Sequence, residues 1–181
     1  AMEAIRSIDK RTLSYSMSQG TPALREEFSK YYRTFGIDLD PDEIIVTAGG
    51  SEALLATFLT CFDPGDEVII TEPGYANYLS FAAAAGLAVT SKIENGFALP
   101  SAEDFKKAIT PRTKAILICN PNNPTGYLYS PEELFQLRDL VKEHDLFLIS
   151  DEVYREFVYT GEPYISALTL FGIEENVIVV D

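Results

Sequence analysis

The scarcity of several residue types in this 181-residue sequence argues against whole classes of protein. Only two cysteines occur, Cys61 and Cys119, and they stand far apart with no C-x-x-C spacing. A disulfide scaffold and a cysteine zinc site are therefore disfavoured, no metal site is predicted, and a reducing compartment is the simpler expectation. Lysine and arginine number 14 against 28 acidic residues, a net charge of −14. Because such a surface repels phosphate backbones and no basic run occurs, we expect no nucleic-acid partner.

Long hydrophobic runs are also missing. The longest apolar stretches are of strand length, well short of the ~20 residues that a membrane helix needs. No basic region followed by an apolar run opens the chain, so the sequence predicts no signal peptide. Hydrophobic residues make up 46% and charged residues 23%, which is ordinary for a packed globular domain. These features predict a soluble, cytoplasmic protein with no membrane partner.

Short β-rich segments alternate with helical patterns along the chain. The strand candidates are rich in Val, Ile and Leu and often continuously apolar, as expected of strands covered on both faces; they are 44–47, 67–71, 87–92, 115–120, 147–151 and 177–181. The predicted helices are 22–35, 51–62, 75–85, 102–109 and 131–143. The helix at 51–62 is apolar almost all round, so we expect it to be buried. This order predicts an α/β fold, an open and mostly parallel sheet with helices on both faces in three layers.

The chain shows no internal repeat, low-complexity tract or interior linker. We therefore expect one compact unit at 15–181, preceded by an N-terminal arm at 1–14. The sequence ends on the last residue of an apolar strand, so we expect the loop that would follow this strand to lie outside it.

Residues suited to ligand binding follow several of the predicted strands. Two glycines at Gly49 and Gly50 precede a helix, whose first N–H groups can bind an anion. Tyr75, Asn123 and Asp151 follow three other strands and offer a flat ring, an amide and a carboxylate. In an open parallel sheet, ligands bind beyond the carboxyl ends of the strands. A ligand with a phosphate, an aromatic ring and a basic ring nitrogen fits this set.

Each of these residues also has a purely structural interpretation. Gly49 and Gly50 can form a plain tight turn, Tyr75 can be a packing residue, and an Asn-Pro-rich loop around Asn123 is often only a turn. For Asp151 the functional interpretation is favoured, because a carboxylate that ends such an apolar strand is costly without a cation or hydrogen bonds. The single histidine, His144, ends a predicted helix, where a cation suits the helix dipole, and we interpret it as structural.

Five motifs occur in order and at a spacing typical of one family: GTPALR at 20–25, TAGGSEAL at 47–54, DPGDEV at 63–68, NPNNPTG at 120–126 and SDEVY at 150–154. In these motifs the chain resembles the large, cofactor-binding domain of the class I/II, aspartate-aminotransferase-like pyridoxal-phosphate-dependent aminotransferases of fold type I. The resemblance runs from about residue 15 to residue 181. It implies the cofactor pyridoxal 5'-phosphate and, as substrates, an amino acid and a 2-oxo acid.

The resemblance implies a role for each matching position on the cofactor. Gly49, Gly50 and Ser51 correspond to the phosphate-binding residues. Tyr75 corresponds to the aromatic residue that stacks on the pyridine ring and lies near the substrate; many relatives carry tryptophan there. Asp151 corresponds to the carboxylate that pairs with the pyridinium nitrogen and keeps the ring able to accept electrons.

Three further positions complete the implied site. Asn123 corresponds to the amide that bonds the ring oxygen of the cofactor and lies near the substrate carboxylate, and Tyr154 to a phenol that bonds the same oxygen. Tyr15 corresponds to a tyrosine that reaches the phosphate of a neighbouring subunit. The resemblance thus implies a homodimer whose active sites are shared between subunits.

The sequence departs from the family at the catalytic lysine. In the family, the Schiff-base lysine follows the strand that here ends at residue 181, and neither Lys92 nor Lys114 stands at a matching position. The C-terminal part of the large domain and the small domain also lie outside this sequence. The resemblance therefore implies no catalytic residue within these 181 residues, and we expect the chain to be inactive by itself.

Other functions share part of this pattern. The same fold type hosts C–S lyases and decarboxylases, and release of pyruvate and ammonia without a 2-oxo acid acceptor would indicate a lyase. Aminotransferase-like domains also serve as ligand sensors in transcriptional regulators, which a helix-turn-helix upstream in the gene would favour. A generic dinucleotide-binding sheet ranks last, because no G-x-G-x-x-G follows the first strand.

Overall fold

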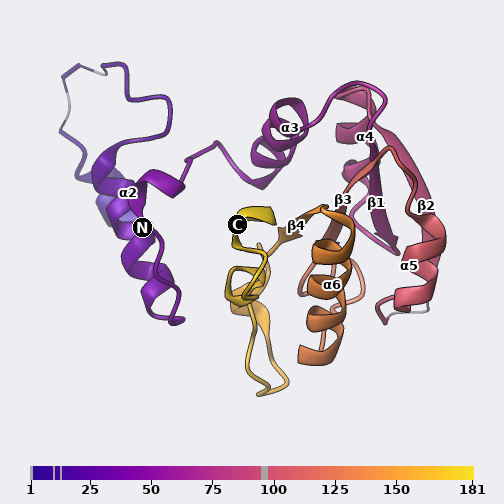
Figure 1. Cartoon of the computed structure of the whole chain (residues 1–181). Coiled ribbons are helices and arrows are strands. Elements are labelled where there is room, and N and C mark those ends of the chain that lie inside the picture. Colours follow the sequence, from indigo (N-terminus) through magenta and orange to yellow (C-terminus); the bar gives the residue numbers. More distant parts are fainter. Residues whose placement is uncertain (1, 10, 13, 95–97) are drawn as a thin grey trace. The chain divides into compact units, whose positions relative to one another are not determined.

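A computed structural model describes residues 2–9, 11–12, 14–94 and 98–181 of the chain (Figure 1). The chain forms two compact units, Ala1–Thr47 and Ala48–Asp181, which we call the N-terminal and C-terminal units. The predicted arm at 1–14 falls within the N-terminal unit, and its boundary stays a prediction. None of the described helices is long and apolar enough to cross a membrane.

The N-terminal unit contains helices α1 (Met2–Arg6) and α2 (Pro22–Arg33) and the short 3-10 helix η1 (Pro41–Glu43). Helix α2 begins with a proline in its first turn, where the missing N–H costs nothing. The buried Arg25 of α2 donates hydrogen bonds to the Pro41 carbonyl at 2.7 Å and to Asp42 at 2.9 Å. These bonds hold η1 against α2.

The segment at 44–47, predicted as a strand, forms none. Its residues belong to the N-terminal unit, and the Val46 amide donates a single backbone hydrogen bond to the Gln19 carbonyl at 2.9 Å. Gly20 approaches so closely that a Cβ there would lie 2.7 Å from the Val46 side chain. The apolar β-branched residues are thus used in a local contact, and the prediction of a strand was wrong.

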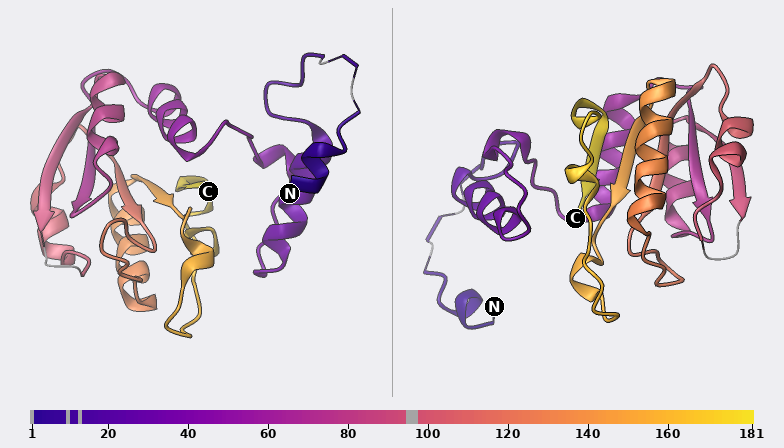
Figure 2. Two further views of the ribbon diagram at one scale, coloured as in Figure 1. Left: turned by 180° about the vertical axis from the view of Figure 1, so that it is seen from behind. Right: turned by 60° about the horizontal axis from the view of Figure 1, so that its bottom comes forward.

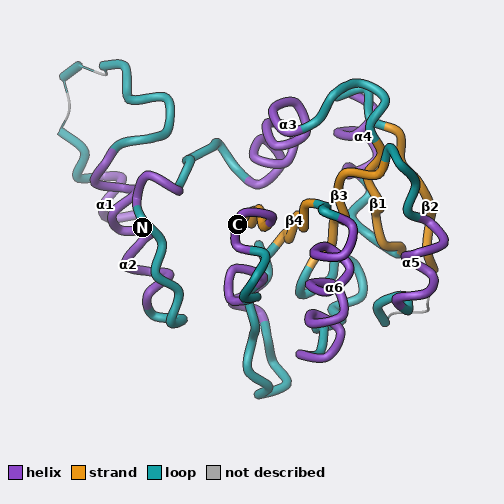
Figure 3. The backbone as a smooth tube through the Cα atoms, in the orientation of Figure 1, coloured by secondary structure: helices purple, strands orange, loops and turns teal. Residues whose placement is uncertain are grey.

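The C-terminal unit is built on five parallel strands in the order β2-β1-β3-β4-β5 (Figure 3). Their bounds are β1 Glu67–Glu72, β2 Ala88–Glu94, β3 Thr113–Cys119, β4 Phe147–Asp151 and β5 Val177–Val180. Apart from the segment at 44–47, the predicted strands and their parallel arrangement are confirmed, within one or two residues at most ends. Because all five strands are parallel, their carboxyl ends meet at one edge of the sheet.

Helices cover both faces of this sheet, as predicted (Figure 2). One buried cluster joins Ile69, Ile116 and Leu148 of the sheet to α5 (Ala102–Ala108) and α6 (Pro131–His144). The other joins the alternate residues Val68, Leu117 and Ile149 to α3 (Gly50–Cys61) and α4 (Asn77–Ala84). Successive side chains of a strand point to opposite faces, so continuously apolar strands supply both cores.

Helix ends follow the sequence signals, whereas the burial of α3 does not. Ser130 and Glu133 form a capping box at the start of α6, and Ser101 caps α5. Helix α3 buries only Leu54 and Phe58, and Leu59 is 59% exposed. It packs on one side against α4 and β5, while Ala56 and Leu59 face solvent, so the expectation of burial all round was wrong. Three short 3-10 helices, η2 (Arg155–Phe157), η3 (Ala167–Thr169) and η4 (Glu174–Asn176), lie between β4 and β5.

Candidate functional site

Asp151, the last residue of β4, lies at the carboxyl edge of the sheet. In the strand register it stands between Cys119 of β3 and Val180 of β5. Only 6% of Asp151 is exposed. Its Oδ2 accepts a 2.6 Å hydrogen bond from the Tyr78 hydroxyl, and its Oδ1 accepts a 3.3 Å bond from the Val153 amide. This carboxylate is thus buried, and it has hydrogen bonds of the kind that its place at the end of an apolar strand requires.

The surroundings of Asp151 act on its pKa in both directions. Burial raises the pKa of Asp151 above its ordinary value, and the charge of Asp181 adds to the rise. The hydrogen bonds from Tyr78 and Val153 lower the same pKa. No ion pair among the described residues includes Asp151. A cation placed beside this carboxylate would therefore be strongly favoured.

Helix α3 begins close to Asp151. Gly49 is the N-cap residue of α3, and its carbonyl accepts the amides of Glu52 and Ala53. A Cβ on Gly50 would lie 3.3 Å from the Val153 side chain and 3.4 Å from that of Val180. Both valines adjoin Asp151, one through its hydrogen bond and one through the strand register. The start of α3, where backbone amides can bind an anion, thus lies beside the end of β4.

Tyr75 follows β1 through the turn at 72–74. Its side chain is half-buried, and its ring meets the Tyr78 ring edge-on, with centroids 5.3 Å apart and an interplanar angle of 82°. Its hydroxyl accepts a 2.7 Å hydrogen bond from the Asn77 side chain. Tyr75 is therefore linked to Asp151 through Tyr78, which touches both residues.

The three asparagines of the loop at 120–126 differ in their surroundings. Asn120 accepts a 3.1 Å bond from the Tyr129 amide, and Asn122 accepts a 3.0 Å bond from the Thr125 hydroxyl. Both are buried and hold the loop. Asn123 is half-buried, and within the described part of the chain its side chain makes no hydrogen bond. Of the three, Asn123 is the most exposed, so its amide is the one that a ligand can reach.

The remaining predicted residues are more exposed. Ser51 lies exposed in the first turn of α3. Tyr154, three residues after Asp151, is 39% exposed, and its ring contacts the Phe157 ring with centroids 6.0 Å apart. Tyr15 is fully exposed and belongs to the N-terminal unit. The C-terminal unit thus brings together the start of α3, Tyr75 and Asp151, while the role of Tyr15 stays a prediction.

Sequence reasoning missed the residues behind Asp151. Tyr78 is almost fully buried, and burial raises its pKa well above the ordinary value, so its hydroxyl stays a hydrogen-bond donor. Burial also raises the pKa of Cys119 to about 11, so its thiol stays neutral. The spacing of Tyr78 from Tyr75 by three residues in the predicted helix 75–85 was the available signal, although α4 itself begins at Asn77. Nothing local connects Tyr78 to a residue 73 positions later.

An open parallel sheet, with a helix start whose amides can bind an anion beside a buried carboxylate, defines an α/β domain of the kind that holds a small ligand beyond its strand ends. The whole chain, residues 1–181, matches the family model for aminotransferase class I and II. The chain belongs to this family, which confirms the resemblance seen in its motifs.

Known relatives agree with this assignment. The chain is 41% identical to the aspartate/prephenate aminotransferase of Thermus thermophilus over 89% of this chain and 43% of that protein. It is 38% identical to the aspartate aminotransferase of Geobacillus stearothermophilus over 92% of this chain and 43% of that one. A structure of the Thermus thermophilus aspartate aminotransferase with maleate superposes with a TM-score of 0.88 at 37% identity, covering 98% of this chain and 47% of that chain. The chain thus spans less than half the length of these relatives.

Proposed function

We propose that this chain binds pyridoxal phosphate at the carboxyl edge of its sheet, as part of an enzyme that moves an amino group between an amino acid and a 2-oxo acid. The observation that carries the proposal is the close approach of Gly50 to Val153 and Val180, which brings a phosphate-binding helix start to the strand end that bears Asp151. The relatives support transfer over the lyase alternatives, and their names favour aspartate as the first amino donor to test. Pyridoxal phosphate is the cofactor that the family implies.

Several features of the residues fit this cofactor. A Cβ on Gly49 would have no atom within 4 Å, so there is open space at the start of α3 for an anionic group. Asp151 is a buried carboxylate outside the described ion pairs, which suits a protonated ring nitrogen. Asn123 carries an amide that the loop does not use.

Each residue then has a distinct task. When bound, the cofactor supplies a protonated aromatic ring that accepts electrons from the substrate. Asp151 keeps the proton on the ring nitrogen by pairing with its charge. The amides at Gly50 and Ser51 and the Ser51 hydroxyl bind the phosphate. Tyr75 would hold the aromatic ring of the cofactor by packing against it.

The oxygen side of the ring and the subunit partner complete the proposal. Asn123 and Tyr154 donate hydrogen bonds to the ring oxygen, and Asn123 and Tyr75 border the substrate. Tyr15, which is fully exposed in the N-terminal unit, contacts the phosphate held by a second subunit of a homodimer.

Lysines with described side chains in the C-terminal unit lie away from the carboxyl edge. Lys114 stands near the amino end of β3, and Lys106, Lys107 and Lys142 lie in the last turns of α5 and α6. We therefore expect this chain to hold pyridoxal phosphate noncovalently, with no adduct fixed by borohydride, and to perform no amino transfer by itself.

A titration of the 181-residue chain with pyridoxal phosphate, followed by absorbance and by protein fluorescence, tests the proposal. We expect saturable binding, and we expect Asp151→Asn to weaken it by tenfold or more, about 1.4 kcal/mol, because a neutral amide cannot offset the ring charge.

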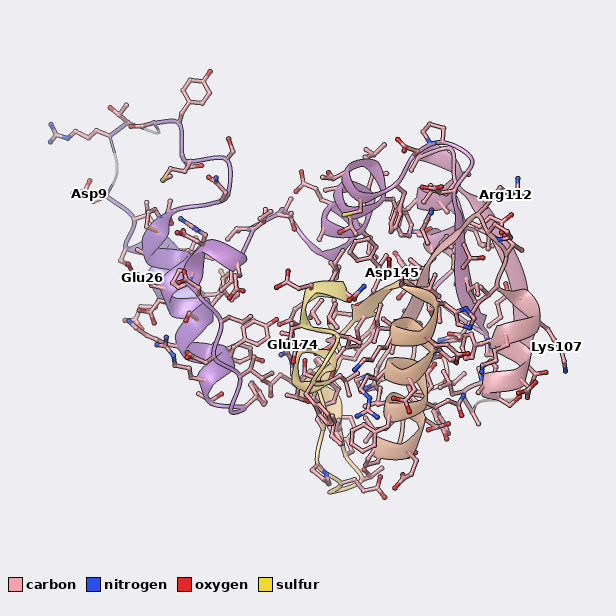
Figure 4. The ribbon with its side chains drawn as sticks, viewed as in Figure 1. Asp9, Glu26, Lys107, Arg112, Asp145 and Glu174 are labelled. Atoms are coloured by element: carbon pink, nitrogen blue, oxygen red, sulfur yellow. The ribbon has the colours of Figure 1, made fainter. Side chains whose placement is uncertain are left out.

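Asp145→Asn is the matched control. Asp145 ends α6 with a left-handed backbone that asparagine tolerates, it is exposed, and it precedes β4 at the other end of the strand (Figure 4). It should bind the cofactor as the wild-type chain does. Equal affinity of the wild-type chain and Asp151→Asn would refute the role of Asp151.

A further inference from the structure

A buried arginine lies next to the predicted site and has no role in it so far. Arg155, in η2, has a side chain that is only 1% exposed. Its Nη2 forms an ion pair and hydrogen bond with Asp181, and its Nη1 lies 4.0 Å from Glu152 Oε2. A guanidinium this deeply buried is stable only beside such carboxylates.

Both carboxylates adjoin Asp151 along the chain or across the sheet. Glu152 follows Asp151 and is fully buried, and its amide donates a 2.7 Å hydrogen bond to the Val180 carbonyl. Asp181 follows Val180, the strand-register partner of Asp151. Arg155 therefore joins the carboxyl ends of β4 and β5 next to Asp151, the residue that we propose to pair with the cofactor ring.

The charges around Asp151 make this arginine important. The negative charge of Asp181 raises the pKa of Asp151. Burial raises the pKa of Glu152, and the positive charge of Arg155 lowers that pKa. The other titratable groups that act on Asp151 or are acted on by it are neutral: Tyr78 of α4 and Cys119 of β3. Arg155 is the cation that pairs with both Asp181 and Glu152 among the described residues. Without it, Asp151 would share its edge of the sheet with two carboxylates that have lost the charge of this cation, and its protonated form would be favoured.

We propose that Arg155 is a positioning residue that keeps Asp151 in its charged form, by offsetting the negative charge of Asp181 and Glu152 and by holding the ends of β4 and β5 together. The value of this charge for cofactor binding rests on the proposed function. The charge itself belongs to the chain alone and can be measured without any cofactor.

The test is a carboxyl ¹³C NMR titration of Asp151 in the cofactor-free 181-residue chain. We expect Arg155→Met to move the Asp151 midpoint to higher pH, and Arg155→Lys to restore it toward wild type because the positive charge is kept. Asp181→Asn should move the midpoint to lower pH, because it removes the carboxylate that disfavours ionisation. The double variant Arg155→Met/Asp181→Asn should fall between the two single variants.

Arg112→Met controls for the general loss of a partly buried ion pair. Arg112 pairs with the buried Glu67 at the amino end of β1 and lies at the periphery of the ribbon (Figure 4). The substitution Arg112→Met should leave the titration midpoint of Asp151 unchanged. An unmoved midpoint in Arg155→Met would overturn the proposal; if that variant does not fold, an unmoved midpoint in Asp181→Asn would do so.

Pyridoxal phosphate affinity, measured in the same variants, separates this proposal from the proposed function. We expect the variants with a higher Asp151 titration midpoint to bind pyridoxal phosphate more weakly at neutral pH. If the midpoints shift as expected while the wild-type chain binds no cofactor, the role of Arg155 stands and the proposed function fails. If the wild-type chain binds the cofactor and the midpoints do not move, the proposed function stands and the role of Arg155 fails.

Discussion

At the scale of single residues, the proposed role of Asp151 in binding a ligand conflicts with the stability of the cofactor-free fold. Its carboxylate is buried, receives one hydrogen bond on each oxygen, and lies near the charge of Asp181. Two hydrogen bonds only partly replace the hydration that an exposed carboxylate keeps. A residue that the fold alone selected would have been neutral here, and this conflict between stability and placement is typical of functional sites.

This conflict predicts a pH-dependent gain in stability for Asp151→Asn. Burial raises the pKa of Asp151 in the folded chain above that in the unfolded chain. The folded state therefore binds more protons between the two pKa values, and the free energy of unfolding of the wild-type chain falls as the pH rises through that range. The variant lacks this loss, so we expect it to be more stable at pH 8 by on the order of 1 kcal/mol and to gain less at pH 4.

Urea unfolding of the cofactor-free chain between pH 4 and pH 8 provides the measurement. The control is again Asp145→Asn, an exposed residue for which the same substitution should give no gain that grows with pH. A variant Asp151→Asn that is less stable than wild type at pH 8 would show that the carboxylate stabilises the fold, contrary to our expectation.

Residue types at strand ends predicted part of the candidate site, and only the packing showed the residues that support it. Asp151 was recognisable because it ends a strongly apolar strand, and Gly49 and Gly50 because they precede a helix. Tyr78 and Arg155 were not, because a tyrosine in an alanine-rich helix and an arginine in a loop have many structural uses. Their contacts with Asp151 and Asp181 span 73 and 26 residues of sequence, which no local pattern encodes.

At the scale of secondary-structure elements, the turn after β1 depends on one glycine. A Cβ on Gly74 would lie 2.8 Å from the Thr71 carbonyl oxygen, closer than such atoms approach in proteins. The obstacle is backbone, so it cannot move aside as a side chain could. Gly74 thus fixes how β1 leads to Tyr75 and α4.

We therefore expect Gly74→Ala to lower the free energy of unfolding by about 1–3 kcal/mol, since the turn must shift to admit the methyl group. Gly49→Ala is the control for stability, because its backbone is extended and a Cβ there would meet no atom within 4 Å. Denaturant unfolding without cofactor measures both. A loss of stability in Gly49→Ala as large as in Gly74→Ala would contradict this account of the turn.

The prediction of helices and strands succeeded where the local sequence determines the element. It failed where contacts with other parts of the chain determine whether a segment joins the sheet or is buried. Strand β4 begins with the apolar residues 147–149 and was located at both ends, and α5 and α6, predicted at 102–109 and 131–143, begin directly after their capping residues. The segment at 44–47 is also rich in apolar, β-branched residues, but its Val46 amide bonds to the Gln19 carbonyl and the segment joins no sheet. Helix α3 is apolar enough to be buried, yet its packing against the sheet and α4 buries only Leu54 and Phe58 of its residues.

At the scale of the whole molecule, the described surface combines large exposed apolar side chains with a strong negative charge. Leu59, Phe171 and Tyr159 are 59%, 70% and 86% exposed, while the chain carries a net charge of −14. Apolar exposure favours association, whereas like charge on two copies opposes it. The balance between these effects depends on ionic strength.

The proposed homodimer should therefore form more readily as salt is added. At about 0.01 M salt the screening length is roughly 30 Å and two copies repel over their whole width; at about 0.1 M it falls to roughly 10 Å, so only charges near the interface still repel. Sedimentation velocity of the chain at tens of micromolar should show the dimer fraction rising across this range. A dimer sustained by ion pairs between subunits would instead weaken with salt, and a monomer at every salt concentration would contradict dimerisation of this chain.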